Sequence, residues 1–157
     1  LGDVYKRQGY VGAAASKALF IGLVILATSL FFVDIEIIHP IIMILFLVFT
    51  CISFSLLGFI LGVWANNFEQ LQLVPLLIIT PLVFLGGSFY SISMLPKFWQ
   101  IVSLFNPVVY LISGFRWAFY DHSDVSIVTS LLVIILFTGF CIFIIFIIFK
   151  TGWRLRP

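Results

Sequence analysis

Long apolar runs separated by short polar breaks dominate the chain. Three of them reach the length of roughly 20 residues that a helix needs to cross the apolar core of a bilayer: residues 12–33, 40–63 and 126–149. Pro40 opens the second run, and a proline is tolerated there because the first helical turn leaves its backbone nitrogen without a partner in any case. The pattern therefore predicts three membrane-crossing helices.

A fourth run, residues 73–90, is less regular. Pro81 lies in its middle and removes a backbone hydrogen bond, so we expect a kink at that point. Pro75 is close enough to the start to be accommodated. Gly86 and Gly87 mark the place where a regular helix should fray. This run predicts a fourth crossing helix with an irregular interior.

Residues 101–120 also have spanning length and could form a fifth span. Against this, Asn106 and Pro107 interrupt the stretch near its start, and the residue before a proline avoids the helical conformation. Arg116, near its end, resists burial in lipid because an ionised side chain there costs several kcal/mol. The local pattern alone leaves both readings open.

The number of spans decides whether the two ends of the chain share one side of the membrane. Lys17, Lys150, Arg154 and Arg156 lie toward the two ends, and cytoplasmic segments are enriched in Lys and Arg. Four spans place all of them in the cytoplasm, whereas five would separate them. We therefore predict four spans with both termini cytoplasmic, and residues 91–124 as an extracytoplasmic, re-entrant helical element.

Composition supports this class of fold. The chain is 63% hydrophobic and only 9% charged, with a mean hydropathy of +1.28. A soluble domain needs charge on every exposed face, so soluble enzymes and nucleic-acid readers are excluded. The net charge of +2 is too small to indicate a polyanionic partner. The fold class is an all-α membrane protein with membrane lipid as its surroundings.

Motifs for chemistry are missing from the sequence. It contains no HExxH or CxxC spacing, no Gly-rich phosphate loop and no pattern of Ser, His and Asp typical of a nucleophilic site. Cys51 and Cys141 lie inside apolar runs and are interpreted as small buried hydrophobes. His39 and His122 fall in predicted outer loops. They could form a shared metal site, but the simpler interpretation is that they are solvated loop residues. We expect no enzyme activity and no cofactor.

Small residues recur along one face of the second predicted helix, at spacings of i, i+4, i+7 and i+11. They are Cys51, Ser55, Gly58 and Gly62. Gly58 and Gly62 form a GxxxG pattern, which lets another helix approach closely. The alternative is that small residues are simply common in membrane helices. Whether the neighbour belongs to the same chain stays open.

Two further groups of residues are candidates for function. The first group lies in and around the predicted re-entrant element of residues 91–124, and it consists of Gly86, Gly87, Asn106, Pro107 and Arg116. Arg116 faces a translocation path or only extends to the outer membrane surface, and Asp121 and Asp124 are near enough in sequence to pair with it. In the cytoplasmic turn, residues 64–72, the candidates are Asn66, Asn67, Glu69 and Gln70. They cap helix ends or contact a partner subunit.

The first eight residues, LGDVYKRQ, are abruptly polar and do not start with Met. They resemble a translated adapter or assembly scar and are set aside from the fold. This start also suggests that the chain is a fragment.

Residues 61–127 resemble the membrane permease of ABC-2 type transporters. The similarity rests on LGVWANNFEQ after one span, then PLVFLGGSFYS, MLPKFWQ and FNPVVY with a downstream FR. The apolar pattern fits from residue 9 to residue 157. The resemblance implies a permease with six spans, of which this chain would hold the last four. It also implies re-entrant helices between the fifth and sixth spans.

Family members work as dimers with two cytoplasmic ATPase subunits, so the resemblance implies an ATP-binding cassette exporter subunit in the bacterial inner membrane. The sequence has no Walker motif, which agrees with a separate ATPase. The alternatives are a membrane scaffold without transport, or a secondary transporter. The latter should carry coupling carboxylates inside its spans, whereas Asp and Glu fall in predicted loops.

Overall fold

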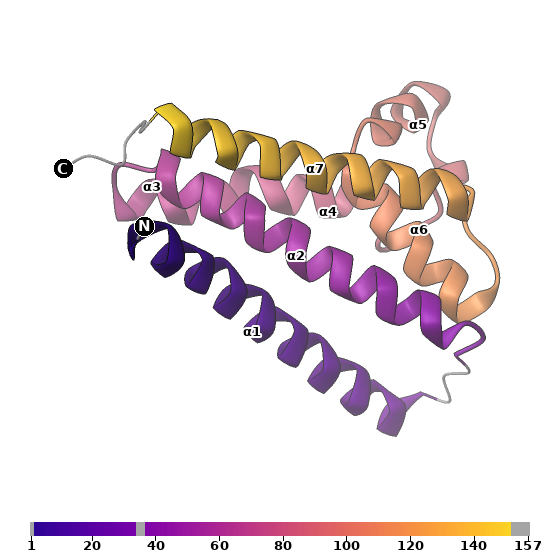
Figure 1. The fold of residues 1–157 in the computed structure, drawn as a ribbon. Coiled ribbons are helices and arrows are strands. Elements are labelled where there is room, and N and C mark those ends of the chain that lie inside the picture. Colours follow the sequence, from indigo (N-terminus) through magenta and orange to yellow (C-terminus); the bar gives the residue numbers. More distant parts are fainter. Residues whose placement is uncertain (1, 34–36, 152–157) are drawn as a thin grey trace.

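The computed structural model describes residues 2–33 and 37–151, and all regular structure in them is helical. The helices in chain order are α1 (Gly2–Phe32), α2 (Pro40–Trp64), α3 (Phe68–Val74), the π-helical turn η1 (Pro75–Ile79), α4 (Thr80–Leu85), the 3₁₀ turn η2 (Ile92–Met94), α5 (Lys97–Leu104), α6 (Pro107–Tyr120) and α7 (Ile127–Thr151). Figure 1 shows the long helices side by side, with α5 and α6 gathered at one end.

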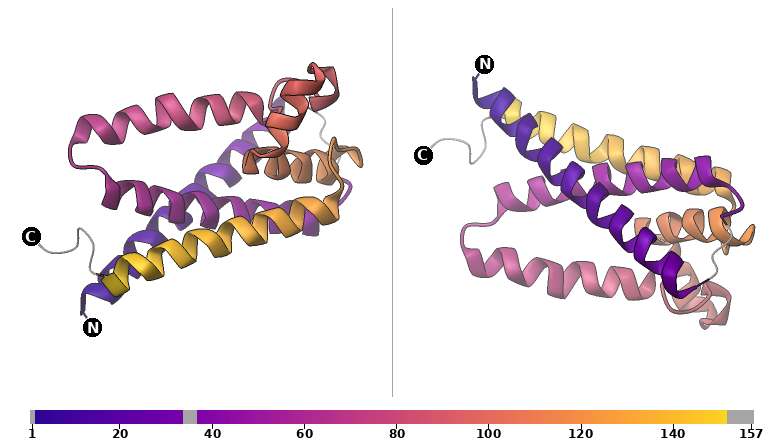
Figure 2. Two further views of the ribbon diagram at one scale, coloured as in Figure 1. Left: turned by 90° about the horizontal axis from the view of Figure 1, so that it is seen from above. Right: turned by 90° about the horizontal axis from the view of Figure 1, so that it is seen from below.

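Four segments of the described chain are long and apolar enough to cross a membrane. They are Val11–Phe32, Pro40–Trp64, Phe68–Leu85 and Ile127–Thr151. This confirms the predicted number of spans and the class of fold. The start of α1 and the end of α7 lie at the same end of the bundle in all three views (Figures 1 and 2).

The third span differs from its predicted range, since it begins at Phe68 and not at residue 73, and it ends at Leu85. The apolar run that predicts the span starts later than the helix, because the first helical turn includes the polar residues Glu69 and Gln70. The predicted turn of residues 64–72 is therefore a short connection of residues 65–67. The end of the third span at Leu85 agrees with the break expected at Gly86.

Near Pro81 the regular α-helix gives way to the π-helical turn η1, just before the proline. Thr80 donates its backbone N–H to the carbonyl of Pro75, and its hydroxyl donates to the same oxygen at 3.0 Å. Both bonds span five residues. Because Pro81 brings no N–H, the helix before it changes its hydrogen-bond spacing, and this is the form that the predicted irregularity takes.

The bent pair α5 and α6 confirms that residues 91–124 are helical in pieces, with an angle of 92° between the two helices. The chain leaves the bundle after α4 and returns to it before α7 at the same end. We call this the re-entrant end, and it also holds the start of α2, where the His39 N–H donates to the Ala118 carbonyl at 3.0 Å. A fifth span would need the pair to end at the opposite side, which these contacts exclude.

The core lies where α6 packs between α2 and α7. Phe46, Val109 and Ile134 come from these three helices and are at most 1% exposed. Halfway along α2 and α7, the Ser53 and Thr138 hydroxyls are 2.7 Å apart. Thr138 donates to the Ile134 carbonyl, so Ser53 is the donor between the helices. Such bonds contribute modestly, roughly 0.6 kcal/mol each.

Gly114 sets the distance between α6 and α2. A Cβ at this position would lie 2.0 Å from Cε1 of Phe46, a ring that is fully buried. We predict that Gly114→Ala lowers the free energy of unfolding by about 1 to 3 kcal/mol, the usual cost of overpacking. The measurement is thermal or denaturant unfolding of the detergent-solubilised protein.

Phe46→Leu in the Gly114→Ala background should restore part of the loss, because it removes the ring that the new methyl group meets. Gly139→Ala is the matched control, since nothing lies within 4 Å of a Cβ there. Equal stability of the Gly114→Ala and Gly139→Ala variants would contradict this account of the α2–α6 contact.

Candidate functional site

The start of α6 is fixed by Asn106 and Pro107, two of the residues singled out from the sequence. Asn106 accepts a hydrogen bond from the Val108 N–H at 3.0 Å, and its amide donates to the Leu82 carbonyl of α4 at 2.5 Å. An Asn cap followed by Pro is a typical helix start. The same side chain thus begins α6 and attaches it to α4.

Gly86 and Gly87, the other candidates at this bend, have separate steric roles. A Cβ on Gly86 would lie 2.9 Å from Val108 and 3.0 Å from Ile112, so only glycine lets α6 come this close to the end of α4. Gly87 has φ +82°, a conformation that side chains disfavour. This conformation turns the chain out of α4 next to Arg116.

Arg116 holds the ends of α4 and α7 together. Its Nη1 donates to Asp124 Oδ2 at 2.6 Å, and its Nη2 donates to the carbonyls of Gly87 at 2.7 Å and Tyr90 at 3.4 Å. Asp124 also accepts from the Ile92 N–H at 3.2 Å and from the Ser91 hydroxyl. The guanidinium therefore finds a carboxylate and two carbonyl groups within the protein, which offsets the cost of removing it from water.

Burial distinguishes this ion pair from a surface one. The Arg116 side chain is 23% exposed and the Asp124 side chain only 9%. At such burial the charges interact more strongly than they would in water, and each depends on its partners. Of the two carboxylates considered from the sequence, Asp124 is the partner of Arg116.

Asp121 pairs instead with His39. The distance from His39 Nε2 to Asp121 Oδ1 is 3.1 Å, and the His39 ring stacks on Trp117 with a centroid distance of 4.1 Å. Asp121 ends α6 in the left-handed conformation (φ 52°), with its N–H on the Trp117 carbonyl. This contact attaches the start of α2 to the end of α6, so His39 is not the simple solvated loop residue that the sequence suggested.

The small-residue face of α2 turns toward α1 of the same chain. Cys51, Ser55 and Gly58 line a cavity of about 420 Å³ between the two helices. The Ser55 hydroxyl donates to the Val11 carbonyl at 2.8 Å. A Cβ on Gly58 or Gly62 would meet nothing within 4 Å. In this structure α1 is therefore beside the face but does not close over its GxxxG.

The four polar candidates at the α2–α3 connection are Asn66, Asn67, Glu69 and Gln70. Gln70 accepts from the Asn66 N–H at 2.8 Å, which is a capping contact. Asn67 occupies the N-cap position of α3 without a side-chain bond. Glu69 is exposed in the first turn. Of these, Gln70 has a visible structural role, and Glu69 presents a free surface.

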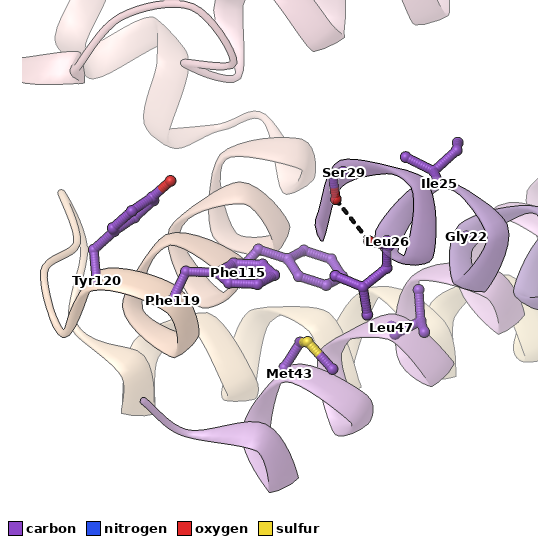
Figure 3. A pocket seen from close by; sticks show the side chains of 9 residues that line it. All are labelled: Gly22, Ile25, Leu26, Ser29, Met43, Leu47, Phe115, Phe119 and Tyr120. Carbon is purple, nitrogen blue, oxygen red and sulfur yellow. Dashed lines mark hydrogen bonds between the residues drawn. The ribbon is translucent and has the colours of Figure 1, made fainter. Parts of the chain in front are cut away.

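A second cavity, of about 300 Å³, lies at the re-entrant end between α1, α2 and α6 (Figure 3). Its walls include Leu26, Ser29, Met43, Leu47, Phe115 and Phe119. In Figure 3 the rings of Phe115 and Phe119 point from α6 toward α1. The Ser29 hydroxyl is already used, because it donates to the Leu26 carbonyl at 2.8 Å. The cavity is therefore almost entirely apolar.

Sequence reasoning missed the cluster of His39, Trp117 and Asp121 and the cavity beside it. His39 and Asp121 are 82 residues apart in the sequence, so no local spacing of residues predicts their contact. The available signal was weak: an Asp directly after a predicted helix and a His directly before another, both expected at one membrane surface. The described residues hold no group of three or more His, Cys, Asp or Glu that could bind a metal.

Arg154 and Arg156, on which the predicted orientation partly depends, lie outside the described residues.

Comparison with known proteins gives consistent matches. Residues 9–120 match the family described as ABC-2 type transporter. Over 129 residues the chain is 46% identical to the inner membrane transport permease YadH of Escherichia coli K12, which covers 82% of this chain and 50% of that protein. YadH of Escherichia coli O157:H7 and of Shigella flexneri match equally well. The chain thus spans about half the length of these relatives. No solved structure matches significantly.

The two ion pairs at the re-entrant end should differ in their effect on stability. We predict that Arg116→Gln lowers the free energy of unfolding by about 2 to 4 kcal/mol, because it leaves the buried Asp124 carboxylate without its cation. Asp121→Asn should cost less than about 1 kcal/mol, since that pair is exposed and Asn also tolerates the left-handed conformation. Unfolding in detergent micelles measures both.

Arg116→Lys is the informative control. It keeps the charge beside Asp124 but has no planar fork to reach the Gly87 carbonyl at the same time, so an intermediate loss is expected. Equal losses for Arg116→Gln and Asp121→Asn would show that burial does not distinguish the two pairs.

Proposed function

Because the chain belongs to the ABC-2 type transporter family, we propose that it forms part of the membrane permease of an ATP-driven exporter in the bacterial inner membrane. The observation that carries the proposal is the family match over residues 9–120, which extends from α1 through the bent pair α5 and α6. The relatives named as inner membrane transport permeases support it. Residues 9–157 would then be the C-terminal part of the permease, and residues 1–8 no part of it.

In this proposal the chain itself binds no nucleotide. A cytoplasmic ATPase subunit hydrolyses ATP, a second copy of the permease completes the pathway, and both termini face the cytoplasm. The re-entrant end then faces outward. The small-residue face of α2 remains a proposed packing surface, because the space at Gly58 and Gly62 can admit a further helix.

Arg116 and the bend at Asn106 would serve this function by fixing the outer end of the permease. Arg116 is bonded to groups from two segments, the connection after α4 and the connection before α7, so it does not simply extend to the surface. When the spans change their relative positions, this cluster would either move as one body or break, and only one of the two pairs at this end is exposed enough to break easily.

Two alternative functions, a secondary transporter and a membrane scaffold, predict different properties. A secondary transporter should hold carboxylates within its spans. The third span does contain Glu69, contrary to the expectation that acids fall only in loops, but this residue is exposed in the first turn. A scaffold without transport would not respond to ATP at all.

The experiment uses a full-length permease that carries this segment, expressed together with a candidate ATP-binding cassette ATPase from the same source. Copurification of the two and ATP hydrolysis that depends on the permease support the proposal. The control is the same complex with the catalytic carboxylate of the ATPase replaced. A permease that is stable in the membrane and never associates with an ATPase would favour the scaffold.

The α2–α3 connection gives a test of coupling. Glu69→Ala should leave membrane levels unchanged, because an exposed first-turn residue contributes little to stability. It should reduce the stimulation of ATP hydrolysis by substrate if this surface contacts the ATPase.

Gln70→Ala is the matched control on the same turn. It removes the capping contact with Asn66 and should cost about 0.5 to 2 kcal/mol of stability without a specific loss of stimulation. If the Glu69→Ala permease reaches normal levels in the membrane and substrate still stimulates ATP hydrolysis fully, the α2–α3 connection only joins two helices and does not contact the ATPase.

A further inference from the structure

The cavity between α1, α2 and α6 has the properties of a ligand site. Its volume is about 300 Å³, near the lower end of the sizes known for small-molecule sites. Phe115 and Phe119 supply aromatic surface on one side, and Leu26 and Leu47 supply aliphatic surface on the other (Figure 3). An apolar lining of this kind favours apolar groups over water.

The depth of the cavity indicates how a ligand reaches it. On α1 it is lined by residues from Gly22 to Ser29, in the second half of the span Val11–Phe32. On α2 it is lined by Met43 and Leu47, in the first two turns of the span. The cavity therefore lies within the apolar layer, close to the membrane surface at the re-entrant end. An amphipathic molecule could place its apolar part here and its polar part at that surface.

The pair of His39 and Asp121 lies next in sequence or within one helical turn of residues that line the cavity. His39 precedes Met43 by one helical turn on the same face of α2, and Asp121 directly follows Tyr120, which lines the cavity. The Asp121 side chain is 60% exposed, and its partner His39 is charged only when protonated. An unprotonated imidazole bonds the carboxylate without cancelling its charge.

The nearby cations do not neutralise this carboxylate. Arg116 is bonded to Asp124 at 2.6 Å. Lys97 begins α5, which packs against η2 and α6. Figure 1 shows α5 on the opposite side of the bundle from α1. The surface above the cavity therefore complements a positive charge.

We propose that this cavity binds an amphipathic cation, with its apolar body between Leu26, Leu47 and Phe115 and its ammonium group beside Asp121. Burial of the apolar part supplies most of the affinity, and the carboxylate selects the charge. The inference deepens the proposed function, on which it rests, because it names the class of substrate. The cation is either a small hydrophobic amine or a phospholipid with an amine headgroup.

The test uses the full-length permease in nanodiscs of phosphatidylcholine and phosphatidylglycerol, without nucleotide or ATPase. The probe is a decylammonium compound with a diazirine at the end of its chain, and mass spectrometry locates the labelled residues. Decyl compounds with ammonium, maltoside and sulfate heads serve as competitors. We expect labels on α1 and α6 at the cavity, and competition by the ammonium compound at about fivefold lower concentration than by the maltoside.

Variants separate the two parts of the site. Leu26→Trp fills the cavity and should abolish labelling, whereas Leu23→Trp is the matched control, because Leu23 does not line the cavity and is 44% exposed. Leu26→Phe replaces Leu26→Trp if the larger side chain prevents folding. Asp121→Asn should leave competition by the maltoside unchanged and remove the preference for ammonium over maltoside.

Equal competition by the three headgroups, or equal loss of labelling in Leu26→Trp and Leu23→Trp, would overturn the proposal. Adding phosphatidylethanolamine then decides the source of the ligand: strong competition identifies the lipid, and weak competition identifies a small amine, and both support the site. Intact labelling without permease-dependent ATP hydrolysis would overturn the proposed function alone. ATP hydrolysis stimulated by substrate, without labelling at the cavity, would overturn this inference alone.

Discussion

The guanidinium of Arg116 is the constraint on which the re-entrant end depends. An ionised side chain at the edge of the apolar layer must be satisfied within the protein, or the segment that carries it must move to water. Here it is satisfied by the carbonyl of Gly87 after α4 and by the carboxylate of Asp124 before α7. Arg116 of α6 thereby joins the end of the third span, α4, to the start of the last span, α7. Helix α6 itself does not cross the membrane.

Helix α6 has this central position because its surface is compatible with close packing on all sides. Gly114 admits the ring of Phe46 from α2, and Gly86 admits Val108 at the end of α4. Asn106 caps the start of α6 and bonds to α4, and Asp121 ends it beside His39. Polar contacts thus lie at the helix ends and close packing lies between them, which is the arrangement expected where no water is available to satisfy a broken backbone.

The two ion pairs of this end give it unequal rigidity. Asp124 is nearly buried and accepts bonds from two segments, whereas Asp121 is largely exposed and bonds to a single imidazole. Of the two polar connections, the one between α2 and α6 is therefore weaker than the one between the segments before and after α6. The apolar cavity lies on the side of α6 with the weaker polar connection.

The sequence by itself determined the four spans, the broken stretch between the last two and the even number of crossings. Apolar length, proline and the distribution of Lys and Arg are local properties of the chain, read against a bilayer of fixed thickness. It could not place the start of α3, because a polar first turn looks like a loop until a cap such as Gln70 is seen. Only the tertiary structure assigned Asp124 to Arg116 and Asp121 to His39, and only it formed the cavity beside Phe115. Those contacts join residues far apart in the sequence, and they depend on how closely three helices approach, a distance that glycines and ring positions set jointly and that no periodicity records.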